Sequence, residues 1–166
     1  MTMKLIFVRH GQAVPHHDDA GRDLTDFGRQ QAKQTAEFLV GEGLIDVIIT
    51  SPYNRANQTA SIIFDELVVA GQEPDFITVN RITPDDNPKI GINDIEYALH
   101  HKYGTQMDGL TVAIVCHMPI VAHMTAILEG DCPSHFELAE CRVLQAEIIA
   151  EGLAHQIRRF VPIQPE

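Results

Sequence analysis

Short apolar runs alternate with amphipathic segments over most of the chain. The apolar runs carry side chains suited to burial on both faces, which is typical of strands in a parallel sheet. The amphipathic segments repeat apolar residues three or four positions apart, which predicts helices. The predicted strands cover residues 4–8, 46–50, 76–79 and 111–116, and the predicted helices cover residues 25–40, 54–70, 88–102 and 119–129.

The last part of the chain breaks this alternation. Residues 143–150 and 154–161 read as two strands joined by a turn at Glu151 and Gly152, and such a hairpin suits the edge of a sheet. Strands that alternate with helices imply a mostly parallel sheet covered on both faces. The predicted fold class is therefore α/β, a three-layer α/β/α sandwich with a mostly parallel sheet and a C-terminal edge hairpin.

The composition is that of one globular domain spanning residues 1–166. Apolar residues make up 45% and charged residues 21%, and no repeat, low-complexity stretch or linker interrupts the chain. A net charge of -11 repels nucleic acid and anionic membranes, so we expect neither as a partner. It also means that an anionic substrate would need a local cluster of positive groups.

Targeting and redox signals point to the cytoplasm. No apolar run approaches the roughly 20 residues that span a bilayer, and the first residues do not resemble a signal peptide. The three cysteines, Cys116, Cys132 and Cys141, are odd in number and form no Cys-x-x-Cys pair. We therefore expect free thiols in a reducing cytoplasmic environment, without a disulfide framework or a thiolate zinc site.

Two of the predicted strands run directly into a histidine, the first into Arg9 and His10 and the fourth into His117. The second strand is followed by Arg55, one turn into the next helix. Ligands of open α/β sheets bind beyond the carboxyl ends of the strands, so these side chains would converge if the strands are parallel neighbours. Two guanidiniums and two imidazoles would form a positive pocket, and the planar forks of arginine match the oxygens of phosphate.

Four segments in this order resemble the histidine phosphatase superfamily, the phosphoglycerate mutase-like proteins. They are residues 8–13 (VRHGQA), 24–32 (LTDFGRQQA), 51–60 (SPYNRANQTA) and 115–119 (VCHMP). The short length, the compact segment at residues 81–86 and the closing hairpin resemble the SixA-type branch, the small phosphohistidine phosphatases. Larger members carry long insertions between the second and fourth strands, and this chain has no room for them.

The resemblance implies a role for each residue of the cluster. His10 would be the nucleophile, attacking phosphorus through Nε2 and forming a covalent phosphohistidine. Arg9 and Arg55 would hold the non-bridging oxygens, and His117, as an imidazolium, would stabilise charge on the transferring group. Gln12, where relatives often carry Glu or Asp, would donate a hydrogen bond to the phosphate. The resemblance implies no metal and no cofactor.

The general acid is not fixed by the resemblance. Relatives that act on phosphate esters use a carboxylate to protonate the leaving oxygen. Asp85 and Asp86 follow the third predicted strand, at the edge of the sheet suited to that task, and we favour them over Asp18 and Asp19 on the first loop. A phosphoramidate depends less on an acid, because its imidazole departs readily once protonated.

The sequence thus predicts a small phosphatase that acts through phosphohistidine on His10, with protein phosphohistidine as its substrate. One alternative keeps this chemistry but takes a small phosphomonoester, such as a sugar or nucleotide phosphate. A second alternative is a non-catalytic module that binds phosphate or a phosphoprotein, and a third is a metal-dependent hydrolase. The histidine pairs at residues 16–17 and 100–101 are candidate metal ligands. Side chains of adjacent residues on a helix or strand point in different directions, however, so we interpret both pairs as solvated polar surface.

Overall fold

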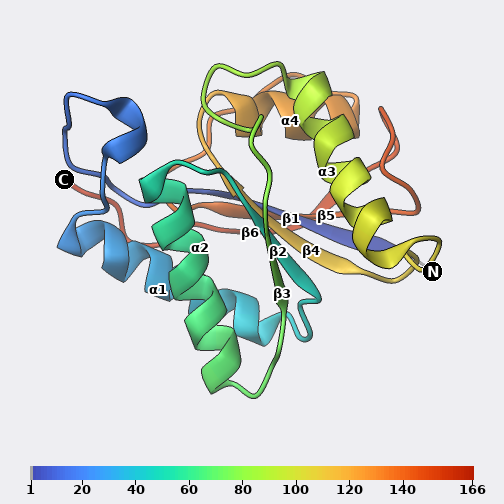
Figure 1. Ribbon diagram of the computed structural model, residues 1–166, viewed down its shortest axis with the longest axis horizontal. Coiled ribbons are helices and arrows are strands. Elements are labelled where there is room, and N and C mark those ends of the chain that lie inside the picture. Colours follow the sequence, from blue (N-terminus) through green and yellow to red (C-terminus); the bar gives the residue numbers. More distant parts are fainter. Residues whose placement is uncertain (1) are drawn as a thin grey trace.

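The structure, a computed structural model, describes residues 2–166. A six-stranded sheet runs through the middle of the molecule (Figure 1), with the strand order β3-β2-β4-β1-β5-β6. The first four strands of that order are parallel, and β5 and β6 complete the sheet as an antiparallel hairpin. The strands are β1 (Met3–Arg9), β2 (Val47–Thr50), β3 (Asp75–Thr78), β4 (Thr111–Cys116), β5 (Cys141–Ala146) and β6 (His155–Phe160).

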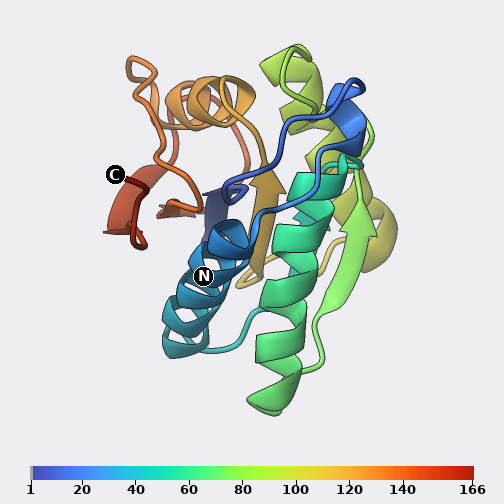
Figure 2. The same ribbon diagram turned by 90° about the vertical axis from the view of Figure 1, so that its left-hand side faces the viewer.

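Helices cover both faces of this sheet, as the turned view in Figure 2 shows. Side chains of α1 and α2 pack with Ile6 and Val8 of β1 on one face, whereas those of α3 and α4 pack with Leu5 and Phe7 on the other. This alternation follows from the two-residue period of a strand. The helices are α1 (Asp26–Gly41), α2 (Asn54–Val69), α3 (Pro88–Tyr103) and α4 (Ile120–Glu129), with a short 3-10 turn, η1 (Asp19–Gly21), in the first loop.

The predicted α/β sandwich is confirmed, including the helix starts. Thr25 caps α1 by accepting a hydrogen bond from the backbone nitrogen of Gly28 at 2.9 Å. Asn87 caps α3 in the same way, and Pro88 occupies its first turn. None of the helices within residues 2–166 is long and apolar enough to cross a membrane.

The closing hairpin differs from the prediction in the length of its strands. Both strands are shorter than expected, so residues 147–154 connect them, and the turn predicted at Glu151 and Gly152 lies within this connection, closed by a hydrogen bond from the backbone nitrogen of Leu153 to the carbonyl oxygen of Ala150 at 3.3 Å. Within this connection the backbone nitrogen of Gly152 donates to the carbonyl oxygen of Ile127 at 3.0 Å. The connection therefore pairs with the end of α4, which ends the β5–β6 ladder early.

The order of the strands brings three chain segments to one edge of the sheet. β4 lies between β1 and β2, with Arg9 opposite Cys116 and Thr50 opposite Val115. The residue after each strand, namely His10, His117 and Ser51, therefore begins a loop at the carboxyl edge.

Candidate active site

His10 is buried at the end of β1, and its contacts fix which nitrogen carries the proton. Nδ1 lies 2.6 Å from the carbonyl oxygen of Gly11. Because a carbonyl oxygen only accepts, Nδ1 is protonated and Nε2 holds the lone pair. Nε2 in turn accepts a hydrogen bond from Nε of Arg55 at 3.2 Å.

The surroundings of His10 also keep it neutral. Burial is the main cause that lowers its pKa, to about 3, and the positive charges of Arg55 and Arg9 act in the same direction. The hydrogen bond to Gly11 opposes this shift without cancelling it. At neutral pH the imidazole therefore has an unprotonated Nε2, the form that a nucleophile requires.

Two glycines hold the loop after His10 in place. The backbone nitrogen of Gly11 donates to the hydroxyl of Thr59 on α2 at 3.1 Å. A Cβ at Gly11 would lie 2.5 Å from the carbonyl oxygen of Gly28, and a Cβ at Gly28 would lie 2.0 Å from that of Gln12. The loop and the start of α1 can therefore approach this closely only because both positions lack a side chain.

Arg55 lies in the first turn of α2 and is 3% exposed. Besides its bond to His10, it donates from Nη1 to the carbonyl oxygen of Asp19 at 2.7 Å and from Nη2 to the carboxylate of Asp19 at 3.1 Å. Partial burial raises the pKa of Asp19, but the hydrogen bond and charge of Arg55 outweigh it and lower the pKa overall. Arg55 thus joins the nucleophile candidate to the first loop.

His117 follows β4 and is completely buried. Its ring centroid lies 5.2 Å from that of His10 and 5.3 Å from that of Tyr53, and its Nε2 lies 2.7 Å from Oγ of Ser51. Burial, and after it the charges of His10 and the arginines, lowers the pKa of His117 to about 2. The protein groups alone therefore keep this ring neutral, whereas the resemblance to the family implied an imidazolium. A bound dianion would favour protonation, because an opposite charge stabilises the charged form.

Arg9, the last residue of β1, donates from Nη1 to the carbonyl oxygen of Phe136 at 2.8 Å. Burial lowers its pKa most, and the charge of Glu137 opposes this. Two buried side-chain nitrogen or oxygen atoms in residues 2–166 have no hydrogen-bond partner in the protein. They are Nε of Arg9 and Nδ1 of His117. Buried polar groups are nearly always paired, so two unpaired nitrogens in one cluster indicate a site for an oxyanion.

Gln12 is tied to the start of α1. Its carboxamide oxygen accepts from the hydroxyl of Thr25 at 2.7 Å, and its backbone nitrogen donates to the side chain of Gln31 at 2.9 Å. This leaves the carboxamide nitrogen of Gln12 as the group for the phosphate contact that the sequence predicts.

The two carboxylates favoured as general acid are engaged elsewhere or point to solvent. Asp86 accepts from the backbone nitrogen of Thr83 at 2.9 Å and from its hydroxyl at 2.5 Å, which holds the turn before α3. Asp85 is exposed. Within residues 2–166, the carboxylate that contacts the cluster through a hydrogen bond is that of Asp19, which was the less favoured candidate for the general acid. The sequence pattern does not predict this contact, because it depends on how the first loop folds back onto Arg55.

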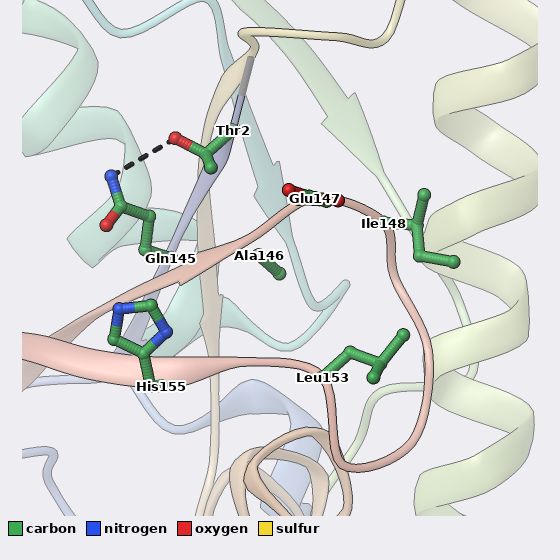
Figure 3. A pocket seen from close by; sticks show the side chains of 7 residues that line it. All are labelled: Thr2, Gln145, Ala146, Glu147, Ile148, Leu153 and His155. Carbon is green, nitrogen blue, oxygen red and sulfur yellow. Dashed lines mark hydrogen bonds between the residues drawn. The ribbon is translucent and has the colours of Figure 1, made fainter.

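A pocket at the opposite end of the sheet does not belong to this cluster (Figure 3). Gln145 and Thr2 line it and are joined by a hydrogen bond of 3.1 Å. Thr2 precedes β1 whereas Arg9 ends it, a separation of roughly 20 Å along a strand. Nor do residues 2–166 contain a group of three or more His, Cys, Asp or Glu side chains placed to hold a metal ion.

Comparison with known sequences supports the resemblance. The profile of the histidine phosphatase superfamily (branch 1) matches residues 5–76. Over 65 residues the chain is 43% identical to the serine/threonine-protein phosphatase Pgam5, mitochondrial, of Drosophila grimshawi, a match that covers 38% of this chain and 22% of that protein. The chain thus spans only about a fifth of the length of that relative.

Solved structures match along nearly the whole chain. The protein histidine phosphatase SixA complexed with tungstate superimposes with a TM-score of 0.81 and 21% identity, covering 96% of this chain and 97% of that one. SixA from Nakamurella multipartitia gives a TM-score of 0.76 and 20% identity, covering 98% of both chains. At these identities the likeness establishes the fold. The chain therefore has the fold of the histidine phosphatases, in the compact form found in SixA, and its residues 5–76 are similar to that superfamily in sequence.

Proposed function

We propose that the chain is a phosphatase that hydrolyses its substrate through a covalent phosphohistidine on His10. One observation carries this proposal. The unprotonated Nε2 of His10 lies in the same cluster as two buried nitrogens, Nε of Arg9 and Nδ1 of His117, that have no partner in the protein. A tetrahedral phosphoryl group offers oxygens to both nitrogens and phosphorus to Nε2.

The proposed reaction has two displacements. Nε2 of His10 attacks phosphorus, a nitrogen–phosphorus bond forms, and the bond to the leaving group breaks as that group takes up a proton. Water then attacks the phosphohistidine, which releases inorganic phosphate and restores His10. Arg9, Arg55 and His117 hold the non-bridging oxygens in both steps, and Gln12 adds a donor. Such preorganised donors are each typically worth about 3 to 4 kcal/mol in the transition state.

The carboxylates near the cluster favour a phosphoramidate substrate. Asp19 has a lowered pKa, because Arg55 stabilises its ionised form, so it is a poor proton donor at neutral pH. An alkoxide leaving group needs a strong donor, whereas the imidazole of a phosphohistidine departs readily once protonated. We therefore propose protein phosphohistidine as the substrate, and the superimposed SixA structure, which is named a protein histidine phosphatase, supports this choice.

A phosphate monoester is the second candidate substrate. It is favoured by the sequence match to Pgam5, whose name assigns it to phosphoserine and phosphothreonine, although that match covers only part of either chain. In this case Asp85 or Asp86 would have to supply the proton, after a rearrangement that releases Asp86 from Thr83.

Competing substrates separate these candidates. The values of kcat/KM are measured for a histidine-phosphorylated protein domain and for a phosphoserine peptide, with EDTA present, because the proposed steps use no metal. We expect phosphohistidine to be preferred by more than tenfold, about 1.4 kcal/mol in the barrier. A tenfold preference for the ester would reverse the assignment. Turnover of neither substrate, with phosphate still bound, would indicate a binding module.

A further inference from the structure

Ser51 is a buried hydroxyl that the proposed reaction does not use. It follows β2 directly, and it is completely buried. Its Oγ accepts a hydrogen bond from the backbone nitrogen of Tyr53 at 3.3 Å and lies 2.7 Å from Nε2 of His117. These two contacts account for the bonds that Oγ makes within residues 2–166.

The protons of this pair can be placed by counting donors and acceptors. A neutral imidazole carries one proton. If it were on Nε2 of His117, the hydroxyl hydrogen of Ser51 would have no acceptor and Nδ1 would be a bare, buried lone pair. If it is on Nδ1, the hydroxyl donates to Nε2 and only Nδ1–H is left without a partner. Each unpaired buried polar group destabilises the fold, so the second arrangement, which leaves one such group instead of two, is the more stable.

We propose that Ser51 is a positioning residue that holds His117 in the tautomer protonated on Nδ1, so that this nitrogen donates to a phosphoryl oxygen. The inference deepens the proposed function and rests on it. The donor that it assigns is one of the two unpaired buried nitrogens of the cluster. The hydroxyl also serves the protonated ring, since it can turn and accept from Nε2 when a bound dianion charges His117.

The same logic explains how two like side chains, with ring centroids 5.2 Å apart, take opposite roles. In His10 the carbonyl of Gly11 accepts from Nδ1, which puts the lone pair on Nε2, where Arg55 donates to it until the phosphorus of a substrate takes the place of that donor. In His117 the hydroxyl of Ser51 donates to Nε2, which leaves Nδ1–H to bind an oxyanion. A carbonyl partner thus makes one ring a nucleophile, and a hydroxyl partner makes the other a donor.

The tautomer can be read directly from the ring nitrogens. Protein labelled with 15N in its histidines is studied by NMR at neutral pH, without anion and with orthovanadate. We expect Nδ1 of His117 to be protonated and Nε2 to be unprotonated in the anion-free wild type, and the population of this tautomer to fall in Ser51→Ala. A wild-type ring protonated on Nε2 would overturn the proposal, as would an unchanged tautomer in Ser51→Ala. This readout does not depend on turnover, so a protein without phosphatase activity would contradict the proposed function and leave this test intact.

Steady-state kinetics of Ser51 variants provide the second part of the test. Loss of a partner that orients a functional imidazole typically costs about 10- to 100-fold, so we expect kcat of Ser51→Ala to fall by that factor with little change in KM. Ser51→Thr keeps the hydroxyl and should recover most of the loss together with the wild-type tautomer. The matched control is Thr125→Val, which removes a buried hydroxyl bonded only to carbonyls of its own helix and should leave kcat unchanged. An equal loss in Ser51→Thr and Ser51→Ala would show that packing, not the hydrogen bond, is responsible.

Discussion

Arg55 donates from Nε to Nε2 of His10 across 3.2 Å, so one guanidinium touches the nitrogen that would attack phosphorus. Its two terminal nitrogens bind Asp19. A phosphoryl group that reaches Nε2 must therefore lie against Arg55 and within the field of the carboxylate of Asp19. Arg55 thus connects the nucleophile candidate with the first loop, and a bound substrate would contact the same guanidinium.

Replacing Arg55 should slow the reaction by orders of magnitude without unfolding the protein. Arg55→Ala removes a donor that the transition state would use, and such losses typically cost about a hundred- to a thousandfold in kcat. Arg55→Lys keeps the charge but loses the planar fork, so it should recover only part of the rate. Arg81→Ala is the control, because Arg81 is exposed and paired with Asp94. Steady-state kinetics and circular dichroism check both points, and an unchanged rate in Arg55→Ala would remove this residue from the site.

Asp19→Asn should tighten the binding of phosphate. The ionised carboxylate competes for Arg55 with any anion bound in the cluster, and the variant removes that charge but keeps the size of the side chain. Isothermal titration with inorganic phosphate should show a several-fold lower Kd, and the gain should shrink as salt screens the charges. Weaker binding would mean instead that Asp19 is needed to hold Arg55 in place.

The two histidines should make folding sensitive to mild acid. Their pKa values are lowered from 6.5 to about 3 and about 2, so below pH 6.5 the unfolded chain takes up protons that the folded chain does not. The free energy of unfolding should then fall as the pH decreases from 6.5 towards 3, by up to about 1.4 kcal/mol per pH unit for each histidine. Urea denaturation at pH 7, 6 and 5 measures the slope, and His10→Gln should reduce it. Equal stability at pH 7 and pH 5 would contradict the burial of these rings in their neutral form.

Gly28→Ala should damage both stability and activity. The added Cβ would lie 2.0 Å from the carbonyl oxygen of Gln12, so the loop after His10 must move. Overpacking of this kind typically costs about 1 to 3 kcal/mol. Gly41→Ala at the other end of α1 is the matched control, since nothing lies within 4 Å of its added Cβ. Thermal melting should show a lower Tm for Gly28→Ala alone, and equal Tm values for the two variants would refute the close approach.

The sequence was sufficient to predict the fold because its signals are local. Apolar periodicity indicated each strand and helix, and Thr25 marked the start of α1 by its own hydrogen bond to Gly28. The convergence of His10, His117 and Arg55 also followed, since each lies at or just beyond the carboxyl end of a parallel strand. The resemblance to a family added the expected roles.

The features that were missed depend on contacts between segments far apart in the chain. The turn at residues 151–152 was predicted correctly, but the strands beside it were predicted too long, because Gly152 pairs with Ile127 of α4, which no pattern within the hairpin reveals. The contact of Asp19 with Arg55 depends on how the first loop folds back. The hydrogen bond between Ser51 and His117 depends on β2 and β4 being neighbours. The position of Ser51 directly after a strand could have marked it as a candidate site residue.

Detection of the covalent intermediate tests the role of His10 as nucleophile most directly. The protein is mixed with a substrate carrying a radiolabelled phosphoryl group, quenched within one turnover, digested and mapped. We expect label on His10 that is lost in acid and retained in base, that forms and decays at rates able to support turnover, and that is absent from folded His10→Ala. Label on another residue, or full turnover by His10→Ala, would contradict this role.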